Sequence, residues 1–274
     1  MLRSSFTSLC LLVLLAACAS QGTAPPSAVT TKPQYTYSPV AEQAGHASAE
    51  QRDKWLAATD PQAMEVLTYW FEEWDQDQVQ GGKGRYNDKW FPHGPLGAEG
   101  SREVDAEIRS LFLDLFEQAV NGDLEWNIEQ NPFENLAFIL LIDQFSRNMF
   151  RGTPQAYEHD QLALDAARIN VEQGFHRYYF TGYQRLFVVY PLMHHESLAS
   201  QEMCLYLLKS INEQPAYPYQ FLNAMQKGVE HYQMIFMFGR FPHRNPRLGR
   251  ENTAQEEAYL AMQGTQGFVD GSKW

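Results

Sequence analysis

Cysteine is scarce in this sequence, with three residues in a chain of 274. Cys10 lies in an apolar N-terminal stretch that we expect to be cleaved off, and Cys18 lies in a motif that we expect to be modified. Cys204 is then the one cysteine left, which excludes an internal disulfide and any metal site built from cysteine pairs. Because Cys204 lies among leucine residues, we expect a buried, unreactive thiol.

Basic residues are also few compared with acidic ones. The chain has 21 Lys and Arg residues against 33 Asp and Glu residues, which gives a formal net charge of −12. Among the charged residues, removal of residues 1–17 takes away Arg3 alone, so the net charge becomes −13. The overall field of such a chain repels nucleic-acid phosphates and anionic lipid headgroups. We therefore expect no nucleic-acid partner, and we expect any membrane contact to come from a lipid.

Two patterns that are typical of other protein classes are missing. The alternation of apolar and polar residues that marks β-strands does not occur in a convincing run. A zinc-binding helix carries histidines at positions i and i+4, and that spacing is absent, since His194 and His195 are adjacent. We therefore expect an all-α protein without a metal and without a cofactor.

Residues 1–17 have the composition of an export signal. Arg3 supplies a positive charge, residues 9–15 form a short apolar run, and small residues follow. The run is too short to span a bilayer stably. We therefore predict a signal peptide that is removed from the mature protein.

The string Leu15-Ala16-Ala17-Cys18 resembles a bacterial lipobox, in which the cysteine is acylated and becomes the mature N-terminus. An ordinary signal peptide cleaved close to this point is the alternative. Lipidation of Cys18 would place the protein in the cell envelope, anchored in a membrane by its lipid. Because alanine rather than aspartate follows the cysteine, the expected location is the outer membrane, facing the periplasm.

Residues 18–50 have the composition of a flexible tether. Ala, Ser, Thr, Pro and Gln dominate, and Lys32 and Glu42 are the charged residues between positions 19 and 49. Such a segment cannot bury enough apolar surface to offset the entropy lost on ordering. Nearly all aromatic residues come later, so residues 51–274 are expected to form one globular domain.

Helix-start signals recur through this domain. Asp60 is an N-cap that is followed by a proline, Pro61. Asn131 is a second N-cap, and the side chain of Glu134 in the helix after it can reach back to the backbone of the cap. Residues Thr253 to Glu256 form a capping box. These signals predict a stack of antiparallel helices. Four predicted helices begin at Pro61, Ser101, Pro132 and Pro154, and the fourth runs to about Gly174. Two more are predicted over roughly 184–213 and 218–238, and the last begins after Thr253.

Two polar clusters interrupt the apolar helices. The first follows an all-apolar stretch at 136–142, which we expect to be central, and contains Asp143 and Arg147, which share a helix face. The second is His194, His195 and Glu196, after Pro191. A salt bridge at a helix end is one interpretation of the first cluster, and hydrogen-bonding histidines are the interpretation that we favour for the second, over metal ligands.

A third cluster reverses the charge of the chain locally. It follows the helix that carries His231, and its basic residues are Arg240, His243, Arg244, Arg247 and Arg250. The planar fork of arginine binds carboxylate and phosphate groups in bidentate fashion. The cluster therefore predicts a site for an anion, with the protein's own carboxylates, Asp143 among them, as the alternative partners.

Four strings of sequence lie at these clusters: Leu140-Leu141-Ile142-Asp143-Gln144-Phe145-Ser146-Arg147-Asn148, Arg151-Gly152-Thr153-Pro154-Gln155-Ala156, Pro191-Leu192-Met193-His194-His195-Glu196, and Phe238-Gly239-Arg240-Phe241-Pro242-His243-Arg244-Asn245 with Leu248-Gly249-Arg250. They resemble the motifs of bacterial domain-of-unknown-function family 924, over roughly Met64 to Leu260. The resemblance implies a tetratricopeptide-like helical superhelix and no assigned reaction. The family's His-Ser-Glu is His194-His195-Glu196 here, which leaves the role of His195 open.

We expect the three clusters to converge on one pocket, because buried charges need partners. The leading hypothesis is a helical module that binds an anionic small ligand or a partner peptide in a groove, with Arg240, Arg244 and Arg250 as anion contacts. The second is an enzyme, in which Asp143 or Glu196 acts with His194 or His243 in acid–base chemistry. A metallohydrolase is third, because the histidine spacing argues against it. The candidate residues are Asp143, Arg147, His194, Glu196, His231, Arg240, His243, Arg244 and Arg250.

The lipobox generates a direct prediction. Replacing Cys18 by serine removes the thiol that is acylated, so metabolic labelling with a radioactive fatty acid should be lost and unprocessed precursor should accumulate. Unchanged labelling together with normal membrane fractionation of the Cys18→Ser protein would contradict the predicted anchor.

Overall fold

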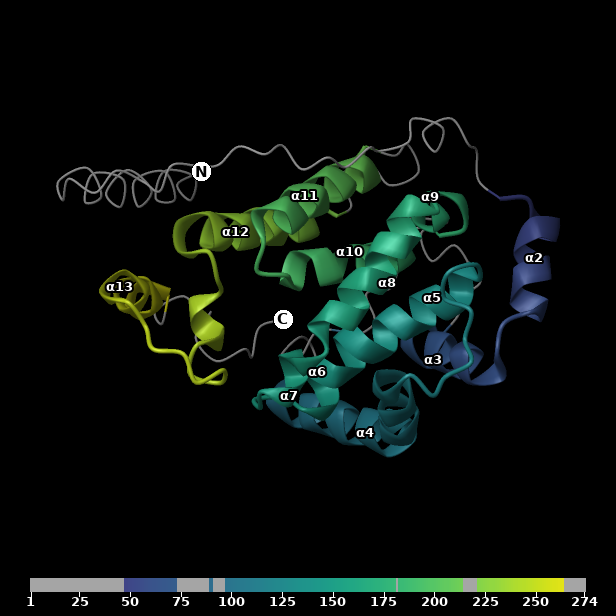
Figure 1. The fold of residues 1–274 in the computed structure, drawn as a ribbon, viewed down its shortest axis with the longest axis horizontal. Coiled ribbons are helices and arrows are strands. Elements are labelled where there is room, and N and C mark those ends of the chain that lie inside the picture. The colour runs from purple at the N-terminus through teal and green to yellow at the C-terminus, as the bar shows by residue number, and fades with distance from the viewer. Residues whose placement is uncertain (1–46, 73–88, 91–96, 181, 214–220, 264–274) are drawn as a thin grey trace. The chain divides into compact units, whose positions relative to one another are not determined.

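The computed structural model describes residues 47–72, 89–90, 97–180, 182–213 and 221–263 (Figure 1). The predicted signal peptide, Cys18 and the tether up to residue 46 lie outside these residues. None of the described residues lies in a β-strand, and the expected all-α fold of one globular domain is confirmed.

The described helices follow one another in a stack. They are α2 (Ala49–Ala57), α3 (Pro61–Phe71), α4 (Gly97–Asn121), α5 (Pro132–Ile139), the π-helix η2 (Leu140–Phe145), α6 (Ser146–Met149), α7 (Gln155–Glu158), α8 (Asp160–Glu172), α9 (Phe175–Tyr178), α10 (Gly182–His194), α11 (Leu198–Asn212), α12 (Leu222–Phe238), the 3-10 helix η3 (Pro242–Arg244) and α13 (Ala254–Gln263). The helices α10, α11 and α12 pack in succession, each against the next.

The predicted caps are largely confirmed. Asp60 and Asn131 accept hydrogen bonds from the first turns of α3 and α5, and Thr253 with Glu256 forms the capping box before α13. The expected return contact of Glu134 to its own cap is wrong. Its carboxylate instead accepts from the backbone N–H of Asp60 at 2.8 Å and so ties α3 to α5.

Several predicted helix boundaries are wrong. Ser101 lies inside α4, and the helix expected from 154 to 174 is divided at His159 into α7 and α8. The helix expected over 184–213 is likewise two helices, α10 and α11. Proline lacks an amide donor, so Pro191 weakens the end of α10, which stops at His194. The predicted start of the next helix at 218 lies outside the described residues, and its predicted end at 238 is confirmed.

The segment from Pro132 to Phe145 is the centre of the core, as its all-apolar stretch predicts. Every residue of this segment is buried, and it contacts α3, α4, α8 and α10. Aromatic rings surround its end, where Phe145 packs edge-on against Trp70 at 5.3 Å between ring centroids. A charged residue placed in this segment is therefore held away from water.

The change from α5 to a π-helix at Leu140 is a feature that the sequence did not predict. A π turn contains one more residue than an α turn and redirects the side chains beyond it, and such turns are frequent at functional sites. Asp143 lies on this turn. Its carbonyl oxygen accepts a hydrogen bond from Nη1 of Arg147 at 2.6 Å, so Arg147 stabilises the backbone where η2 passes into α6.

A smaller hydrophobic cluster positions the turn that carries η3. Met234 and Ile235 of α12 pack with Phe241 and with Tyr259 of α13. Gly239 ends α12 with φ 68°, a left-handed conformation that favours glycine. The turn is thereby fixed between α12 and α13 rather than left as an extended loop.

Cys204 is free and buried as expected, and burial raises the pKa of its thiol. Among the described residues, no helix is long and apolar enough to cross a membrane.

Candidate functional site

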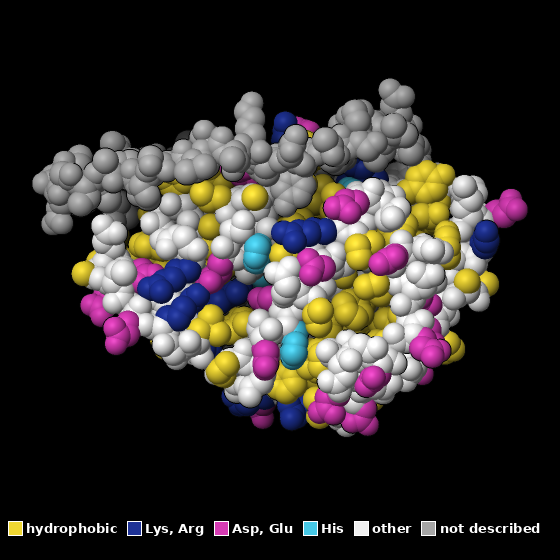
Figure 2. All heavy atoms as spheres, viewed as in Figure 1, with side chains coloured by type: hydrophobic (Ala, Val, Ile, Leu, Met, Phe, Trp, Pro, Cys, Tyr) yellow, Lys and Arg dark blue, Asp and Glu magenta, His cyan; other side chains and the backbone are white. Residues whose placement is uncertain are grey.

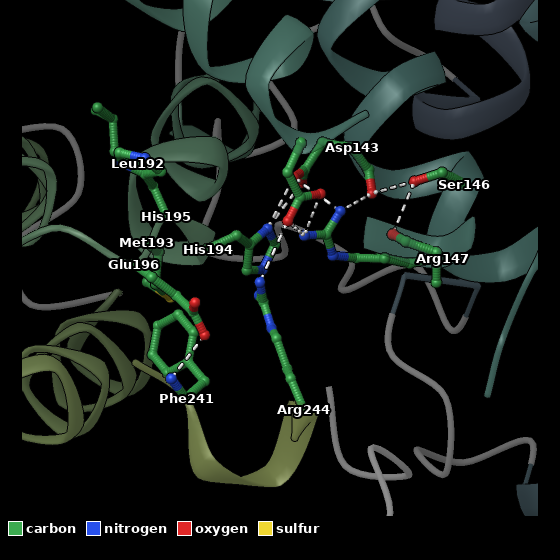
Figure 3. Close-up of polar contacts among 12 residues, drawn as sticks. Asp143, Ser146, Arg147, Leu192, Met193, His194, His195, Glu196, Phe241 and Arg244 are labelled. Carbon is green, nitrogen blue, oxygen red and sulfur yellow. Dashed lines mark hydrogen bonds and ion pairs between the residues drawn. The ribbon is translucent and has the colours of Figure 1, made fainter. Parts of the chain in front are cut away.

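Asp143 is a carboxylate with no exposure to solvent (0 %). Nη1 of Arg147 lies 3.0 Å from its Oδ1, and Nε2 of Gln144 donates to its Oδ2 at 2.5 Å. Nδ1 of His194 lies 2.8 Å from Oδ1 (Figure 3). Because a buried carboxylate is costly without donors, Asp143 holds η2, α6 and the end of α10 together.

The contact with Asp143 fixes the tautomer of His194. An ionised carboxylate only accepts hydrogen bonds, so the proton of a neutral His194 lies on Nδ1 and a lone pair remains on Nε2. Among the described residues, none makes a hydrogen bond to Nε2. His194 thus resembles the oriented histidine of an acid–base pair, with Asp143 as the orienting group.

Asp160, the first residue of α8, links two arginines. Nη2 of Arg147 lies 2.9 Å from its Oδ1, and Nη1 of Arg244 donates to its Oδ2 at 3.3 Å. One carboxylate therefore compensates two guanidinium groups. The chain of charges runs from Asp143 through Arg147 and Asp160 to Arg244.

Arg244 of η3 makes cation–π contacts with two aromatic rings. It is 7 % exposed, and its guanidinium carbon lies 4.6 Å from the ring centroid of Tyr157 and 4.7 Å from that of Phe241. Contact with the two rings leaves the N–H groups of the guanidinium for hydrogen bonds. Figure 3 shows the side chain extending from η3 toward Asp143, Arg147 and His194. Its buried Nε finds no hydrogen-bond acceptor among the described residues.

Arg147, His194 and Arg244 take part in the wall of a cavity of about 60 Å³. None of the described residues in its wall is acidic. Figure 2 shows Lys and Arg side chains gathered on this face, beside η3. The polar residues of the wall are Arg147, Arg151, Arg244, Arg247, His194, His231, His243 and Tyr157.

The charges of the wall shift the pKa values of its members. Burial alone would raise the pKa of Asp143, but Arg147 and His194 outweigh it and hold the pKa below its usual value. Burial and the nearby Arg147 lower the pKa of His194. Burial together with Arg244 lowers the pKa of His243 to about 3. Burial, with Arg147 adding to it, also lowers the pKa of Arg244, against the opposing effect of Asp160.

The predicted site residues fall into two groups. Arg147, His194, His231, His243 and Arg244 line the cavity, and Asp143 contacts two of them. The three sequence clusters therefore meet here, although Asp160 rather than Asp143 contacts Arg244.

The other predicted residues lie outside the wall. Arg250 donates from Nη1 and Nη2 to Glu196 at 2.6 and 2.9 Å, and Glu196 also accepts from the backbone N–H of Phe241. Arg240 makes a matching pair with Glu256, from Nε at 2.6 Å. These pairs use carboxylates of the protein, so they brace the turn around η3.

Three residues that sequence reasoning missed complete the site. Asp160 and Tyr157 hold Arg244, and Asp105 of α4 accepts from Nε and Nη2 of Arg151 at 2.6 and 2.7 Å. Tyr157 directly follows the Arg151-to-Ala156 motif, which is the one signal in the sequence that points to it, whereas Asp160 lies four residues beyond the motif.

Metal binding finds no support in the described part of the chain, where no group of three or more His, Cys, Asp or Glu side chains is arranged to hold an ion. The site instead presents hydrogen-bond donors, which suit an anion.

The comparisons with known proteins agree with this fold. A family model described as bacterial protein of unknown function (DUF924) matches residues 66–264. A solved structure of a protein of unknown function from Agrobacterium tumefaciens is similar, with 28 % sequence identity and a TM-score of 0.58, over 73 % of this chain and 97 % of that one. Comparison with curated proteins gives no match.

The buried position of Asp143 generates a stability prediction. Asp143→Asn keeps the shape of the side chain but leaves Arg147 with one compensating carboxylate, so the free energy of unfolding should fall by about 3 kcal/mol. Urea denaturation at pH 7 measures it.

Asp165→Asn is the matched control, because Asp165 pairs with Arg168 on the surface. It should change the free energy of unfolding by less than about 0.5 kcal/mol. Equal effects of the two substitutions would show that Asp143 is not a centre of the buried network.

Proposed function

The chain belongs to the DUF924 family of bacterial proteins of unknown function, and we propose a function for it from the residues of its own site. It binds the anionic group of a small ligand in the cavity that arginine and histidine side chains line. Four arginines line the cavity, and its wall lacks an acidic member among the described residues. A phosphate or carboxylate group complements such a wall.

Arg244 is the observation that carries the proposal. Its guanidinium is 7 % exposed, shares Asp160 with Arg147, and has a buried Nε without an acceptor among the described residues. A buried donor without a partner costs free energy of about 1–3 kcal/mol, and more if charged. An anion in the cavity would supply the missing charge and acceptors.

The size of the cavity limits what enters it. About 60 Å³ exceeds the roughly 10–15 Å³ that one water requires and is well below the roughly 300–1,000 Å³ of pockets that hold drug-sized ligands. The cavity therefore suits a single anionic group rather than a whole cofactor. A partner peptide, the other ligand class that we expected, would enter through one phosphorylated side chain or a terminal carboxylate.

The proposed setting is the cell envelope. The lipobox at Cys18 would anchor the domain through a lipid, and a tether of about thirty residues would let it reach roughly 30 Å from the membrane. The cavity would then bind anions from the periplasm.

Acid–base catalysis on a phosphorylated or carboxylated substrate is a second candidate, and the pairing of His194 with Asp143 favours it. Release of nitrophenolate from p-nitrophenyl phosphate or p-nitrophenyl acetate tests it. Turnover by the wild-type protein that is lost in His194→Asn would support an enzyme. Equal rates in the wild-type protein and in His194→Asn would argue for binding alone.

Removal of Arg244 tests binding. Phosphate should raise the melting temperature of the wild-type protein in proportion to the logarithm of its concentration, because it binds the folded state. Arg244→Gln removes one charge-assisted donor, and we expect the affinity for phosphate to fall about tenfold or more. Circular dichroism should show an unchanged helical spectrum.

Lys209→Gln is the matched control. It removes one positive charge at a side chain that is 67 % exposed, so it changes the net charge equally but leaves the cavity intact. Equal loss of phosphate binding in the two variants would attribute the effect to the overall field and refute the proposed site.

A further inference from the structure

We infer that the ligand group is a tetrahedral dianion, of the phosphate-monoester class, and that it is bound together with one proton that His194 takes up on Nε2. This inference rests on the proposed function and names the ligand class and the proton-exchanging residue of the same cavity.

The position of the lone pair on His194 is the first step. Nδ1 contacts both carboxylate oxygens of Asp143, at 2.8 and 3.1 Å, so the neutral ring keeps its proton there. His194 belongs to the cavity wall, and its Nε2 has no hydrogen-bond partner among the described residues. A lone pair repels an anion, whereas an Nε2–H attracts it. An anion that reaches His194 therefore requires a proton on Nε2.

The second step is the source of the field around His194. Its surroundings come from several elements, and the charged or titratable groups nearest to it are Asp143, Arg147, Asp160, Tyr190, His231, His243 and Arg244. Arg151, Tyr157 and Arg247 line the same cavity. Without an anion, burial and Arg147 keep the pKa of His194 below its usual value. Two negative charges in the cavity reverse that field and favour the protonated ring.

His194 is the histidine best placed to hold the proton. His231 already directs Nδ1 to the carbonyl oxygen of Lys227 at 2.8 Å, a neutral acceptor. His243 is next to Arg244 in the sequence, and the positive charges of three arginines oppose its protonation. His194 contacts the carboxylate of Asp143 at 2.8 Å, and that carboxylate stabilises the imidazolium.

The directions of the donors favour a tetrahedral group. Figure 3 shows Arg147, His194 and Arg244 approaching one another from three different elements, α6, α10 and η3. A planar carboxylate offers two oxygens in one plane, whereas a phosphate or sulfate offers oxygens in several directions. Two negative charges also match an arginine together with a protonated histidine.

Sulfate is the probe that isolates the proton, because it remains a dianion throughout the neutral pH range. The full chain is titrated with sulfate in a calorimeter at pH 7 and constant ionic strength, in two buffers of different ionisation enthalpy. The heat of binding should differ between the two buffers, and the difference should correspond to uptake of up to one proton. The Kd for sulfate should rise up to tenfold per pH unit between pH 7 and 9. Acetate should bind more weakly than sulfate.

His194→Asn is the informative variant. Asparagine keeps a donor near the position of Nδ1 for Asp143 and lacks Nε2, so the protein should retain its helical spectrum, lose the proton uptake and bind sulfate with little dependence on pH. His195→Asn is the matched control, since Nδ1 of His195 contacts Ser200 Oγ and His195 lies outside the described wall. It should behave as the wild type.

The outcomes separate this inference from the proposed function. Sulfate binding with equal heats in both wild-type buffers and a constant Kd would overturn the inference and leave anion binding standing. Proton uptake that persists in His194→Asn would overturn the assignment to His194, and acetate binding tighter than sulfate would overturn the dianion. Absence of binding by both sulfate and phosphate would overturn inference and function together.

Discussion

The burial of one carboxylate, Asp143, is the constraint on which the site depends. A charge without solvent contact is stable only when other groups compensate it, and here Arg147, Gln144 and His194 do so from three directions. Arg147 also contacts Asp160, and Asp160 in turn contacts Arg244. A single buried group thereby fixes the relative positions of the π turn, α8, the end of α10 and η3.

This network leaves the cavity preorganised. Arg244 is clamped by Tyr157 and Phe241, and Arg151 is held by Asp105, so the entropy of ordering these long side chains is lost on folding rather than on binding. The pairs outside the wall brace the same turn through Glu196. An anion entering the cavity would meet donors that are already in place, which is the arrangement expected of a binding or catalytic site.

The sequence predicted the fold and much of the site because those features depend on local chemistry. Caps and apolar periodicity predicted the helices, and the apolar run before Asp143 predicted its burial. The π turn could not be predicted, because it depends on packing around η2. Arg240, Arg244 and Arg250 are alike in the sequence, and their different roles arise from where Glu256, Asp160 and Glu196 lie in space. Asp160 carried no signal that distinguishes it from other acidic residues on helices.

A crystal of the protein soaked in selenate tests the central claim most directly, because selenium in a tetrahedral dianion gives an anomalous signal. We predict an anomalous peak in the cavity between Arg147, Arg244 and His194, with ligand oxygens at hydrogen-bond distance of about 3 Å from Arg244 and from Nε2 of His194. A cavity that stays without selenate while peaks form elsewhere, or an Arg244 whose donors are all bound to the protein's own carboxylates, would contradict the account.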